Sequence, residues 1–132
     1  MTKVKFKTDV ITDYFKNFSD KNIDALADMY AENVSLTDWI DVHNGKENVL
    51  NANKQLFSNA SSIDVSILNT YPRSWEELND GSFGWQEVVC QIRIDLTVGG
   101  FDQFFNVIDV IRLDKDNKIK SIEAYVMNPS GT

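Results

Sequence analysis

Apolar residues recur at helical spacing in the first part of the chain. One series runs from residue 11 to residue 18 and a second from residue 23 to residue 30, with the polar letters SDKN between them. The members of the two series are Ile11, Tyr14, Phe15 and Phe18, and Ile23, Leu26, Ala27 and Tyr30. We therefore predict two amphipathic helices joined by a short turn.

Residues 33–38 alternate in the way that a half-buried strand does. Val34 and Leu36 share one face with Asp38, so the strand carries a carboxylate toward its apolar side. After a loop, a third helix is predicted over about 45–57. Its inward stripe consists of Val49, Ala52 and Leu56, with Asn53 as the polar member.

From residue 63 onward the pattern changes to long alternating stretches, which predict an antiparallel sheet. The expected strands cover about 63–71, 84–98, 101–114 and 118–127. Gly99-Gly100 is a hairpin signal, and the letters DKDNK predict a second turn. The stretch 71–83, which contains Trp75, has a loop-like composition and is predicted to cross the surface or the mouth of a pocket.

Helices that precede a strongly bent sheet predict an α+β fold, a cone-shaped barrel in which three N-terminal helices cover the concave face. One parity of the strand 84–98 is apolar and should line the interior. That parity comprises Val88, Cys90, Ile92, Ile94, Leu96 and Val98. In the strand 101–114 both parities are apolar, and helices can cover only one of them. We therefore expect a second copy of the chain to cover the outer face, which makes the protein a homodimer.

Asp109 lies in the middle of the apolar run FFNVIDVIRL. Burying an unpaired polar group costs roughly 2–7 kcal/mol, and an ionised group costs more unless it is paired or takes up a proton. Burial would raise the pKa of Asp109 and turn its carboxyl group into a hydrogen-bond donor. This residue is therefore a candidate for a functional role.

The composition is that of a globular protein, and the length gives room for one domain, residues 1–132. With 20 acidic and 13 basic residues the net charge is −7, so we expect neither nucleic acid nor a membrane as a partner. Cys90 is the only cysteine, which excludes an internal disulfide. No stretch has the pattern of a signal peptide or of a membrane span, and a cytoplasmic protein is the expectation.

The chain resembles the NTF2-like superfamily, and within it the ketosteroid isomerase and SnoaL-like branch, from about Asp9 to Val126. The stretches DYFKNFSDKNIDALADMYAENVSLTD, NGKENV and NVIDVIRLDKDNKIKSIEAYV carry this resemblance. It implies a cone-shaped fold of the NTF2-like or cystatin-like kind. It also implies a pocket for a small apolar molecule. Ketosteroid isomerases combine an aspartate base with an oxyanion hole made of a tyrosine and a protonated carboxylic acid.

Matched to that pattern, the resemblance assigns the tyrosine to Tyr14, the base to Asp38 and the protonated acid to Asp109. The implied activity is that of an isomerase or lyase that moves a proton beside the carbonyl group of a steroid-like or polyketide-like compound. No cofactor and no metal are expected. The residues expected to contact the substrate are Tyr30, Trp39, Asn53, Ile92, Ile94, Leu96, Val107, Ile122, Ala124 and Val126.

Structural roles remain open for the same residues. Tyr14 fits a core tyrosine, and Asp38 fits a residue that caps the end of a strand. Trp39 and Trp75 fit packing or interface positions as well as ligand contacts. His43 fits an acid or base, or a surface histidine.

The sequence predicts neither a metal site nor a reactive cysteine. Asp38, Asp41 and His43 lack the spacing of a metal site. Cys90 shares the apolar parity of its strand and is expected to be an inert buried thiol.

Three classes of function fit the sequence: an acid/base enzyme, a module that binds an apolar ligand without changing it, and an association domain that acts through its outer sheet face. The epoxide hydrolases of the superfamily rely on an arginine between two aspartates inside the pocket. Arg93 and Arg112 fall on outward parities, which disfavours that reaction here.

Overall fold

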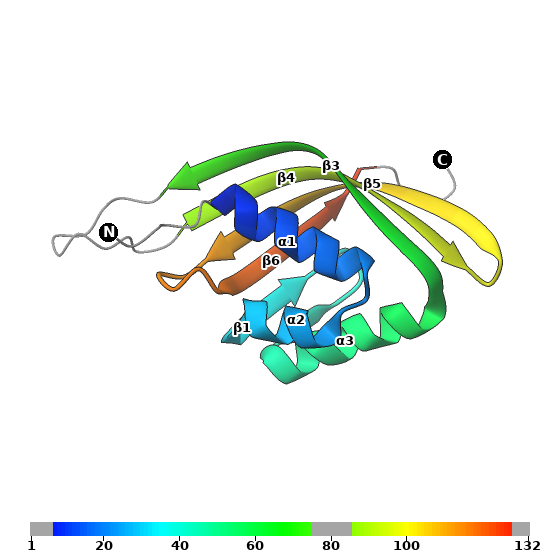
Figure 1. Ribbon diagram of the computed structural model, residues 1–132, viewed down its shortest axis with the longest axis horizontal. Coiled ribbons are helices and arrows are strands. Elements are labelled where there is room, and N and C mark those ends of the chain that lie inside the picture. Colours follow the sequence, from blue (N-terminus) through cyan, green and yellow to red (C-terminus); the bar gives the residue numbers. More distant parts are fainter. Residues whose placement is uncertain (1–6, 75–85, 128–132) are drawn as a thin grey trace, which may run out of the picture.

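The computed structural model describes residues 7–74 and 86–127. Its helices are α1 (Lys7–Ser19), α2 (Ile23–Met29) and α3 (Lys46–Asn59). Its strands are β1 (Tyr30–Thr37), β2 (Val42–Asn44), β3 (Ala60–Ser74), β4 (Gln86–Val98), β5 (Phe101–Leu113) and β6 (Ile119–Val126). The helices lie together on one side of a twisted sheet (Figure 1).

The strands form one sheet in the order β2-β1-β6-β5-β4-β3. β1 pairs with β6 in parallel, and the other neighbours are antiparallel. The predicted α+β fold, helices on a curved and mostly antiparallel sheet, is confirmed. β2 and β3 are free edges in this order, so the sheet does not close into a barrel. The cone arises from curvature and from the helices that cover it.

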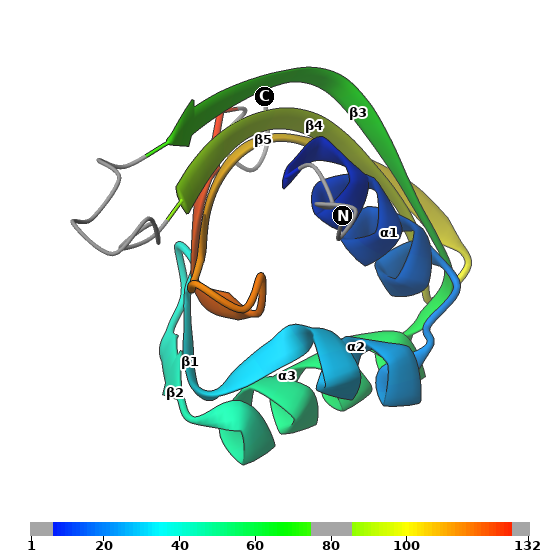
Figure 2. The same cartoon turned by 60° about the vertical axis from the view of Figure 1, so that its left-hand side comes forward.

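The bend of the sheet follows from irregularities in its longest strand. β3 shifts register against β4 between Ala60 and Ser62 and again between Ile67 and Asn69, where Leu68 is the extra residue. Such bulges bend a strand and increase its twist. Figure 2 shows β3, β4 and β5 arching over α1, while α2 and α3 lie on the side of α1 that faces away from this arch.

Tyr30, predicted as the last member of a helical stripe, begins strand β1 instead. Its backbone is extended, with φ −84° and ψ 139°, and its N–H closes the helix by donating to the Leu26 carbonyl. The residue pairs with Ile119 of β6, and its side chain is 1% exposed. The helical spacing was misleading because a strand residue at the helix end buries its ring in the same core.

Two segments that were predicted as loops contain strand. The stretch between Asp38 and Gly45 includes β2, which pairs with the end of β1. In the stretch predicted as a loop over 71–83, Tyr71 to Ser74 instead continue β3 and pair with β4. Pro72 fits there because β3 is an edge strand, where the missing N–H costs no ladder bond. The rest of that prediction, including Trp75, lies outside the described residues.

Both predicted turns are confirmed. β4 and β5 form a hairpin in which Val98 pairs with Phe101 across Gly99 and Gly100. The two glycines have φ of 60° and 80°, a conformation that side chains with a Cβ rarely adopt. The second turn joins β5 to β6, and its Asn117 has φ 61°. Asparagine tolerates this left-handed conformation better than most residues.

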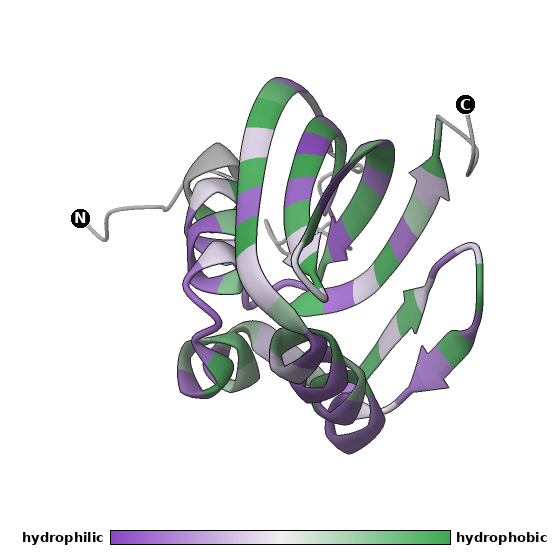
Figure 3. Cartoon of the chain, turned by 90° about the vertical axis from the view of Figure 1, so that its right-hand side faces the viewer, coloured by the Kyte–Doolittle hydropathy of each residue, from purple (hydrophilic) through white to green (hydrophobic). Residues whose placement is uncertain are grey.

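The inward parity predicted for β4 is confirmed at its first half, where the side chains of Val88, Cys90 and Ile92 are 0% exposed. Figure 3 shows the corresponding alternation of hydrophobic and hydrophilic bands along the long strands. Successive side chains of a strand point to opposite faces of the sheet, so such an alternation places one set of side chains toward the core and the other set away from it. No helix among the described residues has the length and apolar character needed to cross a membrane.

Candidate functional site

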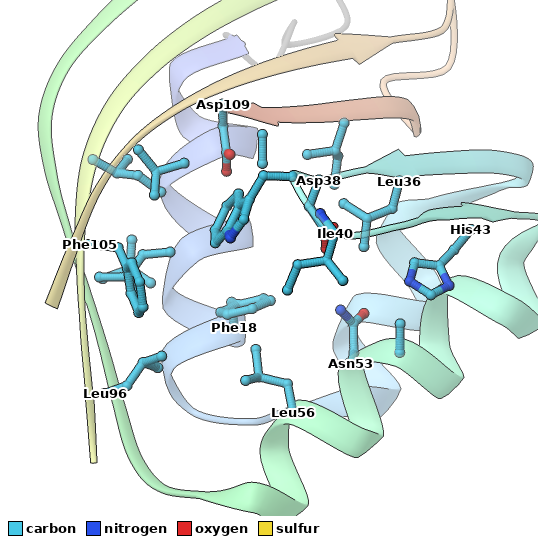
Figure 4. A pocket seen from close by; sticks show the side chains of 18 of the residues that line it. Phe18, Leu36, Asp38, Ile40, His43, Asn53, Leu56, Leu96, Phe105 and Asp109 are labelled. Atoms are coloured by element: carbon cyan, nitrogen blue, oxygen red, sulfur yellow. The ribbon is translucent and has the colours of Figure 1, made fainter. Parts of the chain in front are cut away.

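A cavity of about 430 Å³ lies between the concave face of the sheet and helices α1 and α3. Most of its wall is apolar. Of the residues expected at the site, it is lined by Tyr14, Asp38, Trp39, Asn53, Ile92, Ile94, Leu96, Val107, Asp109, Ile122 and Ala124. The three residues matched to a tyrosine, a base and an acid thus border one cavity (Figure 4).

Asp109 projects from β5 into the cavity (Figure 4). Its neighbours across the ladder are Cys90 and Ala124, and its side chain is 7% exposed. Burial raises the pKa of the Asp109 carboxyl from 3.8 to about 7. Within residues 7–74 and 86–127, no group donates a hydrogen bond to this carboxyl. The group is therefore protonated over part of the neutral range and has a free proton to donate.

Two phenols and an amide form a line of hydrogen bonds, in which Tyr14 and Asn53 line the cavity and Tyr30 lies behind them. The hydroxyl of Tyr14 donates to the oxygen of Tyr30, and the hydroxyl of Tyr30 donates to Oδ1 of Asn53 over 2.7 Å. All three side chains are buried. Desolvation raises the pKa of Tyr14 well above its usual value and that of Tyr30 to about 12. Both phenols are neutral hydrogen-bond donors at physiological pH.

Asp38 follows the end of β1 at the rim of the cavity (Figure 4). Its Oδ1 accepts hydrogen bonds of 2.8 Å from the backbone N–H groups of Ile40 and Asp41. The carboxylate therefore caps the turn that leads into β2, as the structural interpretation of this residue predicted. In the part of the chain that the structure describes, Oδ2 accepts no hydrogen bond, so one oxygen remains available to a ligand.

The mouth of the cavity carries exposed apolar side chains. Trp39 is 46% exposed and Ile40 82% exposed. The ring of Trp39 lies against that of Phe105, with 6.0 Å between the ring centroids. These side chains can cover an apolar ligand that enters the cone, which is the ligand-facing alternative for Trp39.

His43 lies in β2 and is half-buried at the rim, together with Asp41 (Figure 4 labels the histidine). It therefore borders the cavity instead of facing only solvent. No group of three or more His, Cys, Asp or Glu side chains that could hold a metal ion occurs among the described residues.

Two of the expected contact residues lie elsewhere. Tyr30 sits behind Tyr14 and Asn53 and does not reach the cavity surface. Val126 lies at the end of β6, beyond the lining residue Ala124. Because β6 ends there, its last inward position lies past the cavity.

Several lining residues were not predicted. They are Phe15, Phe18, Leu36, Ile40, Asp41, His43, Ala52, Gln55, Leu56, Asn59, Val65 and Phe105. The signal for some of them was present in the pattern. Phe18 belongs to the stripe of α1 that holds Tyr14, and Leu36 shares a face with Asp38. Phe105 has the parity of Asp109, whereas Gln55 and Asn59 carry no apolar signal at all.

Arg93 and Arg112 are engaged outside the cavity lining. Arg93 lies over the ring of Phe104, with 4.2 Å from its guanidinium carbon to the ring centroid. Arg112 forms ion pairs with Glu87, at 2.9 Å, and with Glu123. The lining described above contains no lysine or arginine. The arrangement of an arginine between two aspartates is therefore absent from this lining.

Cys90 is fully buried on the inner face of β4. Desolvation raises the pKa of its thiol to about 12. A thiol in this environment is not a nucleophile at neutral pH, in agreement with the expected inert role.

The comparison with family models matches the SnoaL-like domain to residues 11–122. No curated protein matches the chain. An NTF2-like protein of unknown function from Exiguobacterium sp. 255-15 has a similar structure, with TM-score 0.73 and 13% identity over 91% of this chain and 99% of that one.

Two further solved structures are similar to this chain. A protein with a ketosteroid isomerase-like fold from Catenulispora acidiphila, in complex with trimethylamine, has TM-score 0.70 and 16% identity, covering 88% of this chain and 83% of that one. An LEH-like epoxide hydrolase from M. tuberculosis has TM-score 0.73 and 13% identity, covering 92% and 82%. At these identities the likeness establishes the fold, which proteins of different function share.

Proposed function

The chain belongs to the SnoaL-like domain family, and from this premise we propose that it is a cofactor-independent acid/base enzyme. Its substrate is a small apolar carbonyl compound of the steroid or polyketide kind, and the reaction is an isomerisation or elimination. The observation that carries the proposal is the Asp109 carboxyl, which is buried, points into an apolar cavity and has a pKa of about 7. A structural aspartate at this depth would have a partner.

In this reaction Asp38 takes a proton from the carbon next to the carbonyl group and returns it at another carbon. Its free Oδ2 is suited to that transfer, while the two backbone donors on Oδ1 hold the carboxylate in place. Removal of the proton places negative charge on the carbonyl oxygen. A donor that is fixed in a dry site stabilises that charge more effectively than water does.

The protonated Asp109 supplies this donor. Tyr14 contributes in a different way, because its hydroxyl proton is engaged by Tyr30 in the ligand-free arrangement. To reach the substrate oxygen, the Tyr14 hydroxyl must turn away from Tyr30. We therefore assign the larger share of the stabilisation to Asp109 and the smaller one to Tyr14.

The test is turnover of a panel of β,γ-unsaturated cyclic ketones, from monocyclic to steroidal, followed by the ultraviolet absorbance of the conjugated product. The proposal expects at least one ketone to be isomerised. It is abandoned if every ketone that binds, as judged by thermal stabilisation, remains unchanged.

A second candidate is a module that binds an apolar ligand without catalysis. The two hydrogen bonds that Oδ1 of Asp38 accepts favour this candidate, because capping a turn is a sufficient reason for an aspartate at that position. This candidate predicts ligand-induced stabilisation and no turnover with any member of the panel.

We also propose that the protein is a homodimer through the outer face of β4, β5 and β6. That face carries apolar side chains that the helices cannot cover, among them Phe104, Ile108, Val110 and Tyr125. Charges of both signs stand between them, at Arg93 and Asp95 and at Arg112 and Glu123. A self-complementary surface of this kind suits a two-fold interface.

A further inference from the structure

A row of amide side chains follows the exposed face of α3. Asn48, Asn51 and Gln55 stand three and four positions apart, and Asn44 of β2 extends the row past the start of the helix. Together with Val42, His43 and Ala52 they line a shallow groove of about 350 Å³. We call this surface the amide groove. Its described lining contains no charged carboxylate, lysine or arginine, although 25% of the chain is charged.

The amide groove is continuous with the cavity. His43, Ala52 and Gln55 line both, so the groove begins where the cavity ends at its rim. A molecule that fills the apolar cone and is longer than the cone therefore extends over these amides.

The amides have unused hydrogen-bonding capacity. Asn48 donates from Nδ2 to the Asn44 carbonyl over 2.8 Å. In the described part of the chain, the side chains of Asn51 and Gln55 form no hydrogen bond and no ion pair. An amide offers both donors and an acceptor, which matches hydroxyl groups, since these also donate and accept.

The helix would be more stable with other residues on this face. Asparagine is a poorer helix former than alanine, lysine or glutamate, because its side chain competes for backbone hydrogen bonds. A local choice that opposes the element in which it stands is expected mainly at functional positions. The repeated choice of asparagine along one face therefore supports a ligand contact.

We propose that the amide groove binds the hydroxylated, uncharged end of a small molecule whose apolar body lies in the cavity. A sugar or a polyhydroxylated ring has this chemistry. The inference deepens the proposed function and rests on it for the claim that the cavity holds a small molecule. Anionic ends are disfavoured, because the chain carries a net charge of −7 and the cavity rim presents Asp38 and Asp41 with no lysine or arginine in the lining.

Isothermal titration of three matched probes tests the inference. β-Naphthol supplies the apolar body alone, β-naphthyl glucoside adds an uncharged sugar, and β-naphthyl glucuronide adds a sugar of the same shape with a carboxylate. The glucoside should bind about tenfold tighter than naphthol, as one or two net hydrogen bonds would give. The glucuronide should bind more weakly than the glucoside. Equal affinity for naphthol and glucoside, or a preference for the glucuronide, would overturn the inference.

The double variant N48A/N51A isolates the groove. Alanine favours the helix, so the variant is expected to fold. It should bind naphthol as the wild type does and lose the tenfold preference for the glucoside. The control is Lys54→Ala, on the same helix and outside both linings, which should keep the preference. Retention of the preference in the double variant would overturn the inference.

The outcome is separable from that of the proposed function. A preserved glucoside preference without turnover of any ketone supports the groove and contradicts the enzyme. If ketones are turned over but naphthol and the glucoside bind equally well, the enzyme is supported and the groove is contradicted.

Discussion

The hydroxyl of Tyr30 donates a hydrogen bond of 2.7 Å to Oδ1 of Asn53, which lies 23 residues further along the chain. The bond joins the first residue of β1 to the buried face of α3. Both side chains are almost completely buried, at 1% and 3% exposure. The bond thus satisfies two polar groups inside an apolar core, and it places the amide of Asn53 at the cavity wall.

Replacement of Asn53 by leucine should destabilise the fold. The substitution keeps the volume but leaves the Tyr30 hydroxyl without its acceptor, at a cost of about 1–3 kcal/mol. Urea unfolding measures the loss. The double variant with Tyr30→Phe should lose less stability than the sum of the two single losses, because the Tyr30–Asn53 hydrogen bond can be lost only once, and an additive double variant would contradict the coupling. Lys54→Ala, on the exposed side of α3, is the control and should change stability by less than about 0.5 kcal/mol.

The sequence predicted the architecture because, in most helices and strands, the apolar residues that recur at regular spacing are also the residues that are buried. The alternation of β4 and the glycine pair before β5 identified an antiparallel pair of strands. The hydrophobic period gave a wrong prediction where a helix is followed directly by a strand within one series of apolar residues. Tyr30 continues the spacing of α2 yet starts β1, since both helix and strand can turn a ring into the same core. The three-residue strand β2 is too short to leave any alternation.

Asp38→Asn should separate the two roles of this residue. Asparagine keeps an Oδ1 acceptor for the backbone N–H groups of Ile40 and Asp41, so the turn and the fold should be preserved. It removes the base, and turnover of a β,γ-unsaturated ketone should fall by about 10²–10⁴-fold. Steady-state kinetics measures the fall, and thermal stabilisation by the ketone shows that binding is retained. If the variant turns over ketone as fast as the wild type, Asp38 is only a cap.

The candidate site was less predictable than the fold because it depends on side-chain direction. Parity identified the inward wall at Ile92 and Ile94, and the apolar run around Asp109 identified the buried acid. The partner of the Tyr14 hydroxyl is Tyr30, from another element, and parity alone does not identify this contact.

The pH dependence of turnover should reflect the Asp109 carboxyl. Its proton is the proposed donor, so kcat/KM should decline as pH rises through about 7. Among the described residues, Tyr14, Tyr30 and Cys90 interact electrostatically with Asp109, and burial raises the pKa of each, so they stay protonated throughout this range. In Asp109→Asn the amide donates at all pH values. The alkaline decline should disappear, and its persistence would exclude Asp109 as the titrating donor.

Ile108→Asp tests the proposed dimer. Ile108 lies on the outer face of β5 and is half-buried in the single chain. A carboxylate there would be desolvated at a subunit interface and should split the dimer. Light scattering coupled to size exclusion measures the mass. Gln103→Asp, at an exposed position near the hairpin of the same strand, is the control and should leave the mass unchanged. A wild-type protein of monomer mass would refute the proposal.

Burial of Asp109 should also make stability depend on pH. The unfolded carboxyl loses its proton near its ordinary pKa of 3.8, whereas the folded carboxyl keeps it up to about 7. Between these values the folded state binds more protons, so the free energy of unfolding decreases as pH rises through this window and then levels off. A shift of this size corresponds to roughly 4 kcal/mol, as an order of magnitude.

Asp109→Asn removes the titration and isolates this contribution from that of other acidic groups. Relative to the wild type, the variant should gain stability between about pH 4 and about pH 8, by a few kcal/mol. Urea unfolding of both proteins at the two pH values gives the difference directly. A difference that does not change with pH would mean that Asp109 is ionised in the folded state with a partner or with water. Such a carboxylate could not donate a proton to an oxyanion, so the same measurement decides whether the chemistry proposed for the cavity is available to it.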